Sequence, residues 1–135
     1  MVILENKRKD GIKRIMIVDD EPDINLAFKV VLKRGGFDVD TFDDPVDALE
    51  KFKPRFYDLL ILDTRMPKLD GFELCQKIKK LDGDVKICFL TASELYYERF
   101  REGKYPTLDK DLFIRKPIAN RELLIKINSI LDHTP

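Results

Sequence analysis

Residues 59–63 read LLILD and residues 15–20 read IMIVDD. Each stretch is a run of four apolar residues that ends directly in carboxylates, with no alternation of polar and apolar positions. Strands with this pattern are buried on both faces, which is typical of a parallel sheet covered by helices. The two stretches therefore predict the centre of an α/β sheet, with acidic groups where the strands end.

Amphipathic segments of helical length lie between such runs. Pro22 suits the first turn of a helix that stops at Gly35-Gly36, and Asp44 followed by Pro45 predicts the start of another. A third helix is expected over 71–81, with Leu74, Ile78 and Leu81 forming the apolar stripe that faces the core. The stripe predicted for the first helix consists of Ile24, Ala27, Phe28, Val31 and Leu32.

Three further strands and a last helix complete the pattern. Asn120 is a plausible cap for that helix, whose apolar positions are Leu124, Ile127 and Leu131. A helix is expected to start near Glu94, but Gly103 and Pro106 interrupt it. The further strands are expected within 37–42, 85–90 and 112–114, and the apolar run at 59–62 belongs to a strand expected within 57–62. Five short βα units imply one domain with a parallel sheet and helices on both faces.

Composition narrows the class of protein. The 135 residues carry 25 basic and 25 acidic side chains, so the chain lacks the basic excess of a nucleic-acid binder. Its apolar runs are too short to span a membrane, and its first residues do not read as an export signal. Cys75 and Cys88 are expected to be reduced in a cytoplasmic protein. His133 lies near the chain end, which argues against a histidine metal site or a catalytic triad.

Polar groups follow the predicted strands. Residues 19–21 are acidic, Asp63 ends the third strand, Thr91 the fourth, and Lys116 the fifth. Taken singly, each could be a helix cap, a turn residue or a solvated lysine. Taken together, clustered carboxylates suit Mg²⁺, and a lysine and a hydroxyl opposite the metal suit phosphoryl oxygens. The combination predicts a phosphoryl-transfer site.

These residues lie in motifs that resemble the receiver domains of two-component response regulators. The motifs are VDDE at 18–21, LDTRMPKLDG at 62–71, LTA at 90–92 and KP at 116–117. The resemblance covers roughly residues 12–131. It implies a flavodoxin-like, doubly wound parallel sheet of five strands in the order 2-1-3-4-5. It also implies a receiver domain over 12–132, an extension over 1–11 and a tail over 133–135.

The resemblance implies a role for each site residue. Asp63 is expected to accept a phosphoryl group from a sensor histidine kinase, a phosphotransfer protein or a small phosphodonor. Mg²⁺, with Mn²⁺ as a substitute, would be held by Asp63, directly by Asp20, through a water by Asp19, and by the backbone carbonyl of Arg65. Lys116 would pair with a phosphoryl oxygen.

The family also implies a switch and its partners. Thr91 would move inward to the phosphoryl group, and Phe113 would pass from exposed to buried as it does so. The surface of the fourth helix, fifth strand and fifth helix would then bind an output partner or a second copy. The resemblance makes the domain a signalling phosphoacceptor that assists its own phosphoryl transfer rather than an enzyme, without direct contact to nucleic acid or membrane. The Lys116-Pro117 bond is often cis in this family.

Two other functions compete with this one. A haloacid-dehalogenase-like phosphatase also uses an aspartyl nucleophile, but it needs a second Asp two residues later, where this chain has Arg65. A receiver-like scaffold that works without phosphorylation typically loses acidic or lysine positions that are present here. A P-loop enzyme is excluded because the phosphate-binding run is missing. The segment between Thr91 and Lys116 lacks the family's usual Gly-Ala-x-x-Tyr pattern, and Arg65 and Ser93 occupy its variable flanking positions.

Overall fold

The computed structural model describes residues 11–92 and 112–132. The helix predicted near Glu94, the aromatic residues of 96–105 and the chain end with His133 lie outside this part. The elements are β1 (Arg14–Val18), α1 (Pro22–Arg34), β2 (Asp38–Phe42), α2 (Pro45–Lys51), β3 (Leu59–Asp63), α3 (Gly71–Leu81), β4 (Lys86–Thr91), β5 (Phe113–Arg115) and α5 (Asn120–Asp132).

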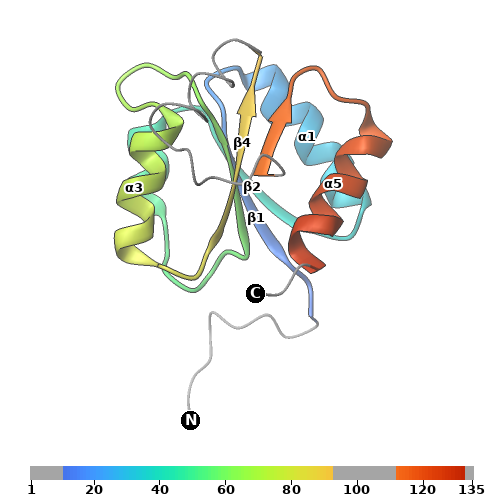
Figure 1. The fold of residues 1–135 in the computed structure, drawn as a ribbon, viewed down its shortest axis with the longest axis horizontal. Coiled ribbons are helices and arrows are strands. Elements are labelled where there is room, and N and C mark those ends of the chain that lie inside the picture. The colour runs from blue at the N-terminus through green and yellow to red at the C-terminus, as the bar shows by residue number, and fades with distance from the viewer. Residues whose placement is uncertain (1–10, 93–111, 133–135) are drawn as a thin grey trace.

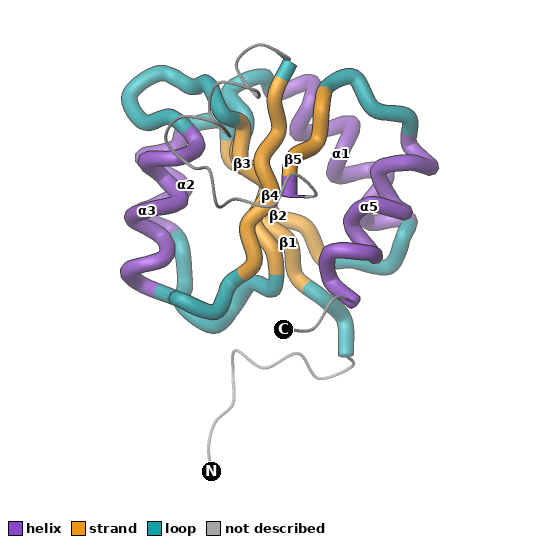
Figure 2. The backbone as a smooth tube through the Cα atoms, in the orientation of Figure 1, coloured by secondary structure: helices purple, strands orange, loops and turns teal. Residues whose placement is uncertain are grey.

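One sheet organises the molecule. Its five strands are parallel and lie in the order β2-β1-β3-β4-β5. The strands point the same way, so their carboxyl ends meet at one edge, at the top of Figure 1. Helices α1 and α5 cover one face and α2 and α3 the other (Figure 2). The predicted fold class and strand order are confirmed.

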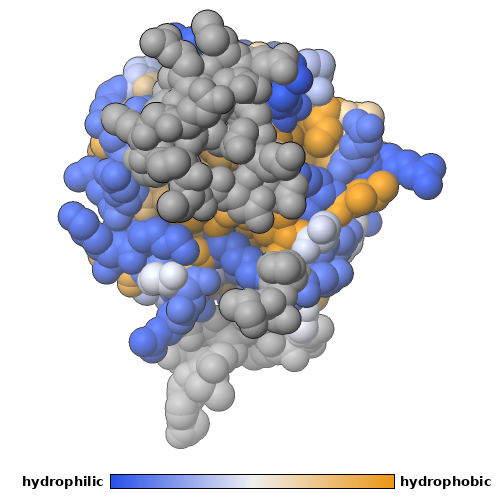
Figure 3. Space-filling view, viewed as in Figure 1, coloured by the Kyte–Doolittle hydropathy of each residue, from blue (hydrophilic) through white to orange (hydrophobic). Residues whose placement is uncertain are grey.

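Each face of the sheet has its own hydrophobic core. Alternate residues of β1 point to opposite sides: Ile15 and Ile17 pack under α1 and α5, whereas Met16 and Val18 pack under α2 and α3. All four are fully buried. Burial on both faces is why the central strands are continuous apolar runs. Hydrophilic residues cover much of the outer surface of the helices, and hydrophobic ones gather between the helix pairs (Figure 3).

Local sequence signals set several helix ends. Pro22 and Pro45 are the first residues of α1 and α2. The side chain of Asp44 caps α2 by accepting a hydrogen bond of 2.9 Å from the Val46 N–H. Gly35 closes α1. Asn120, by contrast, is the first residue of α5 rather than its cap, because the carbonyl of Ala119 accepts the first helical hydrogen bond.

β3, β4 and β5 each end one residue nearer the acidic edge than the predicted ranges, which stopped at residues 62, 90 and 114. β3 and β4 include Asp63 and Thr91, because both residues pair with the neighbouring strand. At the other edge, Phe37, Tyr57 and Val85 lie just outside the strands but are still buried. The candidate site residues Asp63 and Thr91 are therefore held by the sheet itself rather than by loops.

Two predicted stripe positions are wrong. Ala27 is exposed, and Asn25 takes a buried place on α1 instead. Leu81 is 51% exposed because it is the last residue of α3, where the chain turns away from the core. Within the described residues, none of the helices is both long and apolar enough to cross a membrane.

Candidate functional site

Three aspartates meet at the carboxyl edge of the sheet. Asp19 and Asp20 follow β1, and Asp63 ends the neighbouring strand β3. One carboxylate oxygen from each lies within 4.8 Å of the other two. Asp19 and Asp63 are buried, whereas Asp20 reaches solvent. Residues 43 positions apart in the chain are thus brought together, as the strand order predicts.

Asp19 is fixed from both sides. Its Oδ1 accepts a hydrogen bond of 2.9 Å from the Glu21 N–H, and its Oδ2 lies 2.9 Å from Lys116 Nζ. Its side chain is fully buried. Burial raises the pKa of Asp19 above its usual value, although these two contacts act in the opposite direction. The carboxylate therefore has little freedom to rotate.

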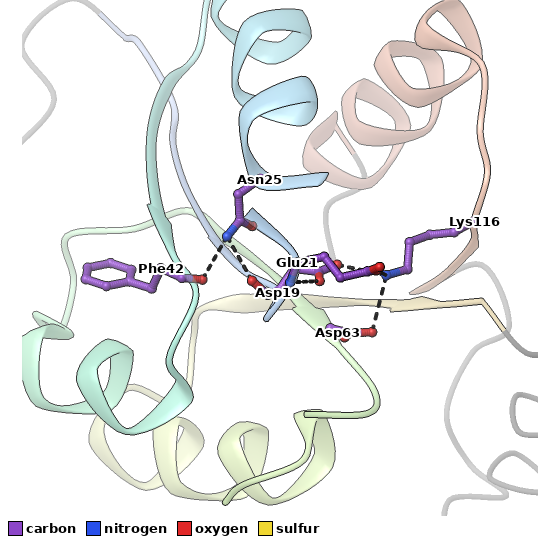
Figure 4. Close-up of polar contacts among 6 residues, drawn as sticks. All are labelled: Asp19, Glu21, Asn25, Phe42, Asp63 and Lys116. Carbon is purple, nitrogen blue, oxygen red and sulfur yellow. Dashed lines mark hydrogen bonds and ion pairs between the residues drawn. The ribbon is translucent and has the colours of Figure 1, made fainter. Parts of the chain in front are cut away.

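Lys116 brings a positive charge to Asp19 and Asp63 (Figure 4). Its Nζ lies 2.9 Å from Asp19 Oδ2, 3.2 Å from Glu21 Oε1 and 3.7 Å from Asp63 Oδ1. Its backbone N–H donates to the carbonyl of Thr91, which anchors it to β4. Burial works to lower the pKa of Lys116, but the hydrogen bond and charge of Asp19 outweigh it, so this pKa is raised. The ammonium stays charged at neutral pH.

Asp63 has the most perturbed carboxylate of the site. Burial, followed by the charge of Asp19, raises the pKa of Asp63 to about 7, while Lys116 acts against this shift. Its ordinary value is 3.8. Asp20 contributes in the same direction as Asp19. A site of this kind holds more negative charge than one lysine can compensate.

The donor set suits a small divalent cation. Carboxylate oxygens are the hard ligands that Mg²⁺ and Mn²⁺ accept, and the spacing lets one ion contact several of them. An added positive charge would also relieve the repulsion that raises the pKa of Asp63. Arg65 lies two residues after Asp63 with an exposed side chain. That the backbone carbonyl of Arg65 is a metal ligand stays a prediction.

Thr91 and Phe113 lie on adjacent strands β4 and β5. Thr91 is fully buried at the end of β4. Phe113 is only 5% exposed and packs on Phe89, with ring centres 5.3 Å apart, and on Phe72. The ring is thus buried in this structure, where an exposed starting position was expected. Its movement with Thr91 stays a prediction.

Sequence reasoning missed Asn25. Its side-chain amide lies in the first turns of α1 and donates to the carbonyls of Asp19 and Phe42, at 2.9 and 3.1 Å (Figure 4). It thereby joins the ends of β1 and β2, and it holds the peptide that leads into Asp20. Its buried Oδ1 has no hydrogen-bond partner within the described residues. One sequence signal could have identified it: Asn25 is a polar residue three positions before Phe28, on the same face of the helix.

Gly71 lies against the backbone of the candidate phosphoacceptor. A Cβ atom at this position would lie 2.2 Å from the carbonyl oxygen of Asp63. Its N–H donates to the carbonyl of Thr64, and Asp70 caps the helix that begins here. The DG pair at 70–71 therefore lets α3 start in direct contact with the end of β3.

Comparisons with known proteins agree with this arrangement. The family model of the response regulator receiver domain matches residues 15–128. The chain is 38% identical over 128 residues to the probable transcriptional regulator ycf27 of Cyanidium caldarium, which covers 95% of this chain and 50% of that protein. The chain spans about half the length of the curated relatives it matches.

Solved structures give the same picture. The non-phosphorylated HemR receiver domain of Leptospira biflexa superposes with a TM-score of 0.76 at 29% identity, covering 91% of this chain and 97% of that one. The response regulator protein TrrA of Thermotoga maritima, solved in complex with Mg²⁺-BeF, has a TM-score of 0.72 at 32% identity and covers 88% of this chain and 99% of its own.

Proposed function

The chain belongs to the response regulator receiver domain family, and on that premise we propose that Asp63 accepts a phosphoryl group in a two-component phosphorelay. The observation that carries the proposal is the position of Asp63, buried between an acidic pair and Lys116 at the carboxyl edge of the sheet. Such an arrangement can bind a phosphoryl group from two sides. It holds a nucleophile, a cation site and a fixed ammonium within one small space.

The proposed step is a direct displacement at phosphorus. A carboxylate oxygen of Asp63 attacks the phosphorus of the donor, an O–P bond forms, and the P–N or P–O bond of the donor breaks. The bonding electron pair leaves with the donor group. Lys116 balances charge on the phosphoryl oxygens and Asp19 keeps Lys116 in place, so the protein contributes mainly position and electrostatics.

Asp19, Asp20, Asp63 and the Arg65 carbonyl are the groups that we propose hold Mg²⁺. When bound, the ion would neutralise carboxylate charge and the charge of the transferring phosphoryl group. The TrrA complex with Mg²⁺-BeF supports this assignment by similarity. Three converging carboxylates in the present chain support it by chemistry.

The same proposal includes a readout. A phosphoryl group adds about two negative charges beside Lys116, and Thr91 and Phe113 would transmit this change to the surface around β5 and α5. The donor would be a sensor histidine kinase or a phosphotransfer protein, and the output a partner protein or a second copy of the chain. The fourth helix of this predicted surface lies outside the described residues.

We also propose a cytoplasmic domain over residues 12–132. Two free thiols support this location: Cys88 is buried and Cys75 is partly buried, without a disulfide between them. Assignment of residues 1–11 and 133–135 as an extension and a tail is part of the proposal.

Intact-mass measurement tests the phosphoacceptor. With acetyl phosphate and Mg²⁺, wild type should gain the mass of one phosphoryl group, because Asp63 is the single phosphoacceptor that we propose. Asp63→Asn, which keeps the shape of the side chain, should gain none, and excess chelator should prevent the adduct in wild type. Asp23→Asn, at an exposed carboxylate of α1, is the matched control and should react normally.

Three results would contradict the proposal. An adduct on Asp63→Asn, or one formed equally well in chelator, would place the nucleophile or the chemistry elsewhere. No adduct on wild type with any donor would favour the scaffold that works without phosphorylation.

A further inference from the structure

Lys116 already pairs with three carboxylates. Its Nζ donates hydrogen bonds to Asp19 Oδ2 and Glu21 Oε1, at 2.9 and 3.2 Å, out of the three that an ammonium can donate. Asp63 Oδ1 lies 3.7 Å away, beyond hydrogen-bond distance, and pairs with the ammonium by charge alone. A phosphoryl oxygen that pairs with Lys116 therefore competes with these carboxylates for its charge. Which carboxylate leaves determines how easily the site is phosphorylated.

Exposure and anchoring single out Glu21. The Asp19 side chain is fully buried and is held through its second oxygen, and the Asp63 side chain is 8% exposed and carries the reacting atom. The Glu21 side chain is 64% exposed, so it can turn into water without a desolvation cost. Of the three contacts, only the one with Glu21 breaks at little cost.

Glu21 also adds charge where a donor must approach. The negative charges of Asp19, Asp20 and Asp63 already exceed the single positive charge of Lys116. Glu21, drawn beside Asp19 and Lys116 in Figure 4, contributes a fourth carboxylate, and its side chain is 64% exposed. Phosphodonors are anions, so this carboxylate repels them at the mouth of the site. The repulsion increases with the charge of the donor.

We infer that Glu21 is a positioning residue that occupies Lys116 until a phosphoryl group displaces it, and whose charge slows the more highly charged phosphodonors. The inference rests on the proposed function of Asp63. Glu21 does not touch the reacting atoms in this role. It acts through Lys116 and through its own charge.

The test compares Glu21→Gln with wild type at saturating Mg²⁺, so that a change in metal affinity does not affect the rates. Glutamine keeps the length of the side chain and removes only its charge. We expect phosphorylation by acetyl phosphate, a dianion, to be roughly two- to fivefold faster in the variant, the range of an exposed ion pair. Phosphoramidate carries one negative charge fewer, and its rate should rise less.

Added salt and a matched variant distinguish the effect of Glu21 itself from that of the overall negative charge around the site. The advantage of Glu21→Gln should shrink as salt is raised to roughly 0.5 M, where the screening length falls to about 4 Å. Asp23→Asn removes the same charge two residues away, from an exposed side chain of α1. It should leave both rates near those of wild type.

The outcomes distinguish this inference from the function it rests on. If wild type is phosphorylated but Glu21→Gln reacts no faster, or if both variants are accelerated equally, the role of Glu21 is refuted and the function of Asp63 stands. A change in unfolding free energy with unchanged rates would make the ion pair merely structural. If wild type accepts no phosphoryl group from either donor, both proposals fall.

Discussion

Replacing Asp63 by Asn should stabilise the metal-free protein, and the gain should grow with pH. The folded state raises the pKa of this carboxyl from 3.8 to about 7. Between these two values the folded state binds a proton that the unfolded chain has released, so the free energy of unfolding falls as pH rises. Asparagine does not titrate and does not incur this loss.

The size of the effect follows from the shift. Each pKa unit corresponds to about 1.4 kcal/mol, so a rise of about three units costs at most about 4 kcal/mol above pH 7. The charges of Asp19 and Lys116 both act on this carboxyl, so part of the cost belongs to the cluster rather than to Asp63 alone. We expect Asp63→Asn to be about 2 kcal/mol more stable than wild type at pH 8, and within about 1 kcal/mol of it at pH 5.

Urea unfolding in chelator at pH 5, 6, 7 and 8 measures this difference directly. For a domain of this size, about 2 kcal/mol corresponds to roughly 8 °C in Tm. Saturating Mg²⁺ should stabilise wild type more than the variant and narrow the gap. Asp23→Asn should show the pH profile of wild type. A constant difference between Asp63→Asn and wild type across this pH range would refute the assigned charge repulsion.

The structure carries three further predictions. Asn25→Ala should bind Mg²⁺ about tenfold more weakly, because the peptide before Asp20 loses its hydrogen bond; titration calorimetry checks this, and unchanged affinity in a folded variant would contradict it. Gly71→Ala should cost about 1–3 kcal/mol in chemical unfolding, because its methyl group would meet the Asp63 carbonyl, whereas a stable variant would mean that α3 shifts freely. Thr91→Ala should still be phosphorylated on Asp63 but lose most of the change in amide exchange over 112–118, and an exchange response like that of wild type would move the switch elsewhere.

The sequence predicts the convergence of the site because parallel strands end at one edge. Asp19, Asp63 and Lys116 each follow an apolar run, so the order of the strands suffices to bring them together. The contacts of Asn25 were not predictable in this way. Its acceptors are backbone carbonyls, which no residue type reveals, and one of them lies 17 residues away.

Side-chain contacts also explain the other differences. The ion pair of Glu21 with Lys116 joins residues 95 positions apart, and a carboxylate directly after an acidic pair has several ordinary uses. The burial of Phe113 depends on rings from β4 and α3. Periodicity gives the face on which such a ring lies, but not whether neighbouring rings cover it.

The packing of Phe113 on Phe72 and Phe89 connects β5 to the site at Asp63. Phe72 follows Gly71, which contacts the carbonyl of Asp63, and it stacks on Phe89 with ring centres 4.5 Å apart. Asp63 and the Phe113 ring on β5 are therefore linked by a short chain of packed groups. Thermodynamic linkage works equally in both directions. If modification of Asp63 changes the affinity of a partner for the Phe113 region, binding of that partner must change the equilibrium of the modification by the same factor. A partner bound at β5 would then also set how readily Asp63 is phosphorylated.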